Sequence, residues 1–219
     1  METTTTTIPV RAIASALGAG AAIVAIGQAL QPLGGDASSM ATLASMHDAP
    51  TRWAIATAFL YGASLCLAGG TLAILTVGWT RLGASGRIGS GLLFLAFTST
   101  LVLDTTQSVE IAMASKLSQS RQMSAAIDRF MSSPTAVAVF VLFLAGLVLG
   151  AAILGVAAWR RDLAPRWLSV LLGLCGVVDF AANAPIVEAT ALATLGTALT
   201  VIAIRFSHPE RTVLASSAG

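Results

Sequence analysis

Four carboxylic acids lie within or at the ends of long apolar runs: Asp104, Glu110, Asp179 and Glu188. A charge at the centre of a bilayer costs about 2.5–3.5 kcal/mol on insertion scales, so such acids are rare outside functional sites. A buried carboxyl without a cationic neighbour is expected to stay neutral or to hold a bound cation. Because a neutral carboxylic acid in an apolar cavity donates a proton readily, these residues predict general-acid chemistry or ion coupling.

Polar side chains accompany two of these acids at the spacing of a helix face. Thr100, Asp104 and Gln107 are related by steps of four and three residues, so they share one face of a helix. Asn183 follows Asp179 by four residues in the same way. We expect both groups to line one polar pocket that opens toward the outer side of the membrane.

Two other apolar segments bring polar residues to the same side. Trp53, Thr57 and Tyr61 share a helix face, and Gln28 and Gln31 come at the end of the first apolar run. The predicted catalytic residues are Asp104, Asp179 and Glu188, and the predicted substrate-binding residues are Tyr61, Gln107, Asn183, Thr100, Trp53 and Gln28.

Each acid also has a structural interpretation that remains open. Glu110 and Glu188 would be solvated if they reach the lipid headgroup region. Asp104 would serve to hold helices together by hydrogen bonds if it bonds to Thr100 and to a neighbouring helix. Asp179 has the weakest structural explanation, because it lies deepest, about 18 Å from the inner end of its helix at 1.5 Å per residue.

The composition places the chain in a membrane. Of its 219 residues, 56% are hydrophobic and only 10% are charged, whereas a soluble domain carries about 25% charged residues. So few charges exclude an ordinary soluble domain, a disordered chain and a coiled coil. Long uncharged runs then predict transmembrane helices.

The apolar runs predict an all-α fold, a single bundle of six transmembrane helices. The forty residues over 167–206 would form a helix of about 60 Å, twice the hydrocarbon thickness, so we divide them near Asn183 and Pro185. The predicted spans are residues 8–30, 53–79, 88–106, 135–159, 167–184 and 186–205. The first span is expected to be retained, because Glu2 and the lack of a basic cluster are atypical of a signal peptide.

The segments between the spans have their own predicted character. Residues 1–7 are expected to be disordered and residues 207–219 to form a mobile tail. Residues 31–52 and 107–134 are predicted to be external. Within the second segment, residues 107–131 are predicted to form an amphipathic helical extension or cap with a methionine-rich face. The glycines at 146, 150 and 155 predict close helix contact.

Basic residues set the orientation. With the N-terminus inside, eight basic residues fall on the cytoplasmic side and four on the other, which favours cytoplasmic N- and C-termini. Tryptophans at 53, 79, 159 and 167 fall at predicted helix ends, as interfacial anchors do. A multi-pass protein of the bacterial inner membrane is the expected localisation.

Other chemical motifs are not found. Cys66 and Cys175 lie in apolar runs and His47 and His208 outside them, so no metal site, disulfide framework or heme is predicted. The sequence has no Gly-rich phosphate loop, no GxSxG, no HExxH and no basic–aromatic stripe, so we expect no cofactor and no nucleic-acid partner. The expected partners are the lipid bilayer and a lipophilic small molecule, and homo-oligomerisation stays open.

One short stretch resembles a known family. The turn over residues 161–168 reads Arg-Asp-Leu-Ala-Pro-Arg-Trp-Leu, and Gly173 and Gly176 follow it. Together with Asp-Ala-Pro at residues 48–50, it is similar to an uncharacterised bacterial family of six-helix integral membrane proteins of similar length. The resemblance implies a fold and carries over no catalytic residues.

The acids predict first a membrane enzyme that acts on a lipophilic, isoprenoid-like substrate. Asp104 or Asp179 would be the general acid of a cyclase or isomerase, and Tyr61 and Asn183 would position the substrate. Two alternatives stay open. One is a small proton- or cation-coupled transporter that uses the same carboxylates. The other is a non-catalytic sensor or assembly subunit with residues 107–131 as its docking surface.

Overall fold

The computed structural model describes residues 10–31, 38–114, 120–181 and 185–206, and the predictions made for residues 1–7 and 207–219 lie outside these ranges. Within them the chain forms helices and no strand, which confirms the all-α fold. The helices are α1 (Val10–Leu30), α2 (Ser39–Asp48), α3 (Pro50–Val77), α4 (Trp79–Ala114), α5 (Ser120–Met131), α6 (Pro134–Arg160), α7 (Arg166–Ala181) and α8 (Pro185–Phe206).

Five of the described helices, α1, α3, α4, α6 and α8, are long and apolar enough to cross a membrane. A further apolar segment, Arg166–Val178 in α7, is shorter. A bilayer core of about 30 Å needs about 20 helical residues. These helices indicate a multi-pass membrane protein.

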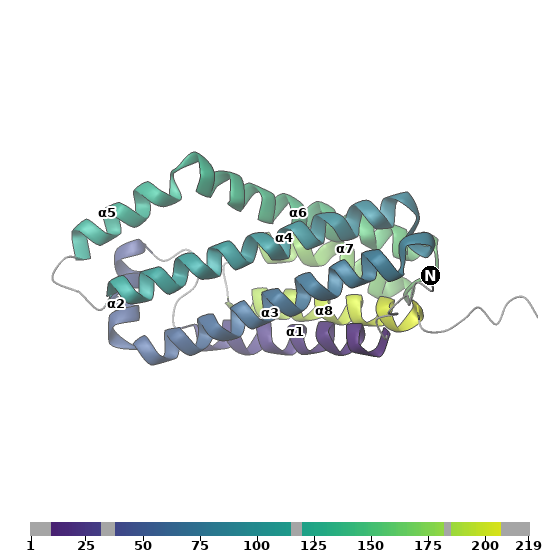
Figure 1. Ribbon diagram of the computed structural model, residues 1–219, viewed down its shortest axis with the longest axis horizontal. Helices are drawn as coiled ribbons and strands as arrows, with labels where there is room; N and C mark the ends of the chain where they lie inside the picture. Colours follow the sequence, from purple (N-terminus) through teal and green to yellow (C-terminus); the bar gives the residue numbers. More distant parts are fainter. Residues whose placement is uncertain (1–9, 32–37, 115–119, 182–184, 207–219) are drawn as a thin grey trace, which may run out of the picture.

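The five long helices and α7 lie alongside one another (Figure 1) and share one hydrophobic core. Each packs against two neighbours, in the order α1, α3, α4, α6, α7, α8 and back to α1. Glycines allow the close approaches: a Cβ at Gly150 would lie 3.0 Å from the Gly89 carbonyl oxygen, and one at Gly155 would lie 2.6 Å from the Ser169 carbonyl oxygen. The helix contact predicted for these α6 glycines is therefore confirmed.

The connection between α3 and α4 is shorter than the predicted gap between residues 79 and 88. Gly78 ends α3, and α4 begins at Trp79 with helical residues on both sides of a kink at Gly83. Gly83 has φ 64° and ψ −177°, a conformation that residues with a side chain rarely adopt. The kink lets the chain turn without the eight-residue loop that was predicted over residues 80–87.

A second, smaller hydrophobic core lies at the end of the molecule opposite the start of α1, where α2 and α5 are found (Figure 1). We call this part the cap, and its buried residues are Leu43, Met46, Trp53 and Ala114. Ile111, Met123 and Ile127 pack against them. Helix α4 reaches this core because it continues to Ala114, beyond the membrane span predicted to end at residue 106 and into the predicted helical extension.

Hydrogen bonds join α2 of the cap to α4 and α5. Ser39 Oγ donates to Asp128 Oδ1 at 2.6 Å, which joins α2 to α5. His47 Nδ1 lies 3.0 Å from the Ala114 carbonyl oxygen and so caps the end of α4. The cap therefore fixes the far end of α4, where the candidate site begins.

Candidate functional site

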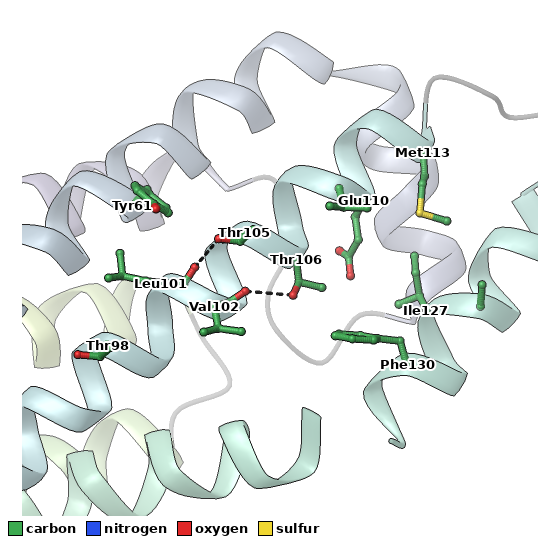
Figure 2. Close-up of a pocket in the computed structure, with 12 residues that line it drawn as sticks. Tyr61, Thr98, Leu101, Val102, Thr105, Thr106, Glu110, Met113, Ile127 and Phe130 are labelled. Atoms are coloured by element: carbon green, nitrogen blue, oxygen red, sulfur yellow. Dashed lines mark hydrogen bonds between the residues drawn. The ribbon is translucent and has the colours of Figure 1, made fainter. Parts of the chain in front are cut away.

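A cavity of about 590 Å³ lies between α4 and α5, with one residue of α3 at its edge (Figure 2). This volume is within the range of about 300–1,000 Å³ found for small-molecule pockets. The lining is mainly apolar. Its residues are Tyr61 from α3, Thr98, Leu101, Val102, Thr105, Thr106, Val109, Glu110 and Met113 from α4, and Ala126, Ile127 and Phe130 from α5.

Among the described residues that line this cavity, Glu110 is the one with a carboxyl group, and none has a basic side chain. It is half-buried, and its carboxyl group points away from α4 into the space in front of Phe130 (Figure 2). The nearby hydroxyls are already used, because Thr105 donates to the Leu101 carbonyl at 2.7 Å and Thr106 to the Val102 carbonyl at 3.1 Å. A ligand in the cavity would therefore meet a carboxyl group in apolar surroundings.

Tyr61 stands at the α3 edge of the cavity, on the other side from Phe130 (Figure 2). It is 40% exposed and also lines a smaller cavity of about 370 Å³ with Thr57 and Ser108. Two aromatic rings thus flank the apolar space. The prediction of Tyr61 as a substrate-binding residue is consistent with this position and stays a prediction.

Asp104 lies in the interface between α3 and α4 and does not line the cavity. It is only 9% exposed, and Ser64 Oγ donates a hydrogen bond to its Oδ2 at 3.0 Å. Thr100 Oγ1 lies 2.9 Å from Ser64 Oγ, so Ser64 links the two predicted residues. Asp104 therefore makes a polar contact with a neighbouring helix, as its structural interpretation expects.

Gln107 makes a similar contact one turn further along α4. Thr57 Oγ1 donates to Gln107 Oε1 at 3.2 Å, across the same α3–α4 interface. The predicted shared face of Thr100, Asp104 and Gln107 therefore exists, and it faces α3. Ser64 was not predicted from the sequence. It could have been found because it lies seven residues after Thr57, on the same face of α3.

Other predicted site residues lie elsewhere. Trp53 is buried in the cap core, where its Nε1 donates to Ser45 Oγ at 3.1 Å. Gln28 is on α1, and its Oε1 is buried without a hydrogen-bond partner in the described part of the chain. Glu188 is half-buried in the first turn of α8. None of the three lines the cavity of Glu110.

The side chains of two predicted site residues, Asp179 and Asn183, are not among those described. Asp179 belongs to the last turn of α7. Asn183 lies outside the described residues. The acid pair of Asp104 and Asp179 therefore stays a prediction, and the described site consists of Glu110 and Tyr61.

Metal binding is not indicated by the side chains described. No group of three His, Cys, Asp or Glu residues is placed to hold a metal ion in residues 10–31, 38–114, 120–181 and 185–206. Cys66 and Cys175 are both free thiols. The chemistry that this site offers is proton transfer by a carboxyl group.

Substitutions of Asp104 test how much its hydrogen bond to Ser64 contributes to stability. Asp104→Ala leaves the buried Ser64 hydroxyl without its acceptor, so we expect a loss of about 1–3 kcal/mol in the free energy of unfolding. Asp104→Asn keeps an acceptor oxygen and should lose less than half as much. Thermal unfolding in detergent measures both, and equal losses for the two variants would show that the hydrogen bond is unimportant.

Comparisons with protein-family models, curated proteins and solved structures give no match to this chain. The resemblance to a bacterial six-helix family at residues 161–168 therefore stays a prediction. The cavity and the side chains that line it are the basis for the function proposed below.

Proposed function

We propose that this protein binds a lipophilic small molecule in the cavity between α4 and α5 and acts on it by acid–base chemistry. One observation carries the proposal: a mainly apolar cavity of about 590 Å³ receives the carboxyl side chain of Glu110. Apolar walls favour an apolar ligand by removing its surface from water. They also disfavour the ionised form of a carboxyl group, which suits a proton donor.

Proton-initiated isomerisation or cyclisation of an isoprenoid-like alkene matches this arrangement. Glu110 would give its proton to one carbon of a double bond, and its carboxylate would then take a proton from a neighbouring carbon of the cation. The carboxyl group is regenerated, so atoms and charge balance within one turnover. Tyr61 and Phe130, on opposite sides of the cavity, would stabilise the intermediate cation with their ring faces.

The membrane placement belongs to the same proposal. We take α7 as a sixth span, with both termini cytoplasmic in a bacterial inner membrane. The 16 residues of α7 extend about 24 Å, enough for a span if the bilayer thins locally. The cap would then lie on the outer side, and a lipophilic substrate would reach the cavity from the outer leaflet.

Proton- or cation-coupled transport is the second candidate, favoured by the contacts of Asp104. Asp104, Ser64 and Thr100 form a buried hydrogen-bonded row between α3 and α4, and carboxylates inside membranes often serve as ion sites. In proteoliposomes this role predicts uptake of a substrate that follows a pH or sodium gradient and is lost in Asp104→Asn.

The experiment that tests the first proposal is a product assay. Purified protein in lipid nanodiscs is incubated with a panel of acyclic isoprenoid alkenes, and the products are identified by gas chromatography with mass detection. We expect an isomer of one substrate, with deuterium incorporated from heavy water at the protonated carbon. Unchanged substrates throughout the panel, or products without deuterium, would contradict acid catalysis.

A further inference from the structure

Two arginines converge on the kink of α4, at the end of the bundle remote from the Glu110 cavity. The guanidinium group of Arg161 lies directly against Gly83, where a Cβ atom would collide with it. Its Nη1 donates to the Arg81 carbonyl at 3.1 Å, and Arg87 Nε donates to the Gly83 carbonyl at 3.3 Å. Both guanidinium groups are therefore held in place beside the same residue.

Among the residues that the structure describes, each arginine uses only part of its hydrogen-bonding capacity. A guanidinium group has five N–H donors, and the contacts above use one donor of each. The ring of Trp79 further fixes Arg87, whose Cζ lies 4.5 Å from the ring centroid. Guanidinium groups suit phosphate recognition, because their planar forks match the phosphate oxygens.

The surroundings of these arginines resemble a membrane–water interface. Trp79 is 51% exposed and Trp159 is 46% exposed, and tryptophan concentrates at the headgroup level of bilayers. Ile88 on α4 and Val156 on α6 are exposed apolar side chains. A ligand with a phosphate at one end and long hydrocarbon chains at the other would contact both features.

We propose that Arg87 and Arg161 bind the phosphate headgroup of an anionic phospholipid, whose acyl chains lie along the exposed apolar side of α4 and α6. The site takes the lipid by its phosphodiester, which Arg87 and Arg161 contact through their free N–H donors. The lipid would bridge α4 and α6, because Arg87 belongs to α4 and Arg161 directly follows α6.

Native mass spectrometry of the full chain with bound lipid tests this site. With equal phosphatidylglycerol and phosphatidylcholine, we expect the wild-type protein to retain phosphatidylglycerol at least tenfold more. The Arg87→Gln, Arg161→Gln double variant should lose this preference, whereas Arg160→Gln, Arg166→Gln, which removes the same charge, should keep it. Equal losses in both pairs would show diffuse attraction and overturn the proposal.

Two further measurements keep the test decisive if the double variant folds poorly. Arg87→Gln alone leaves Arg161 in contact with the kink and should reduce the preference at least threefold. Inorganic phosphate at the same concentration as the lipid should leave the melting temperature of the wild-type protein unchanged. A phosphate-induced rise as large as that with phosphatidylglycerol would identify a free-anion site and contradict lipid binding, as would an unaltered preference in Arg87→Gln.

Discussion

Glu110→Gln is expected to reduce product formation about 100- to 10,000-fold, the usual contribution of a positioned general acid. Glutamine has nearly the same shape as glutamic acid but cannot give up a proton to carbon. The cavity would keep its volume and its apolar lining, so substrate affinity should change less than about threefold. Initial rates of deuterium incorporation, together with a binding isotherm for the substrate, measure the two effects separately.

Thr106→Val is the matched control for this substitution. Thr106 lines the same cavity one turn from Glu110, and its hydroxyl is already bonded to the Val102 carbonyl of its own helix. Valine preserves its shape, so the rate should stay within about threefold of the wild-type rate. If Glu110→Gln kept the wild-type rate, or if Thr106→Val lost as much, Glu110 would not be the proton donor.

Gly89→Ala is expected to lower the stability of the bundle by about 1–3 kcal/mol, with a melting temperature several degrees lower. A Cβ at this position would lie 2.6 Å from the Leu154 backbone nitrogen and 3.0 Å from the Gly150 carbonyl oxygen. Backbone atoms cannot rotate away as a side chain would. Helices α4 and α6 would therefore have to move apart, and the loss appears in thermal unfolding followed by circular dichroism.

Gly91→Ala supplies the control on the same helix. Apart from the neighbouring backbone of α4 itself, no described atom lies within 4 Å of a Cβ built at Gly91. Both substitutions replace glycine by alanine in α4, so the gain in helix propensity cancels between them. The Gly91 variant should be as stable as the wild-type protein or slightly more so. Similar melting temperatures for the two variants would contradict the close α4–α6 contact.

The sequence predicted the helical bundle well because the evidence for it is local. The long uncharged run of α6 sets its bounds within one residue, predicted over 135–159 and observed over Pro134–Arg160. The shared face of Thr100, Asp104 and Gln107 follows from helical spacing alone. What that face contacts depends on α3, and the residue that completes the contact, Ser64, lies 40 residues from Asp104.

The candidate site was harder to predict because it depends on the cap. Glu110 lines a cavity only because α4 continues to Ala114 and α5 stands opposite it. That arrangement relies on distant contacts such as His47 with Ala114 and Ser39 with Asp128. Trp53 shows the same limit: its sequence position suggests an interfacial anchor, yet α2 folds against it and buries it. Helical periodicity contains no information on such contacts.

Photolabelling tests most directly whether a lipophilic molecule occupies this cavity. An isoprenoid analogue with a diazirine group is irradiated with the protein in nanodiscs, and the labelled residues are mapped by peptide sequencing. We predict labels concentrated at Tyr61, Glu110 and Phe130, and their loss in Ala126→Trp, which fills the space from α5. Labels spread over the lipid-facing sides of α1 and α6, unaffected by Ala126→Trp, would contradict a binding cavity at Glu110.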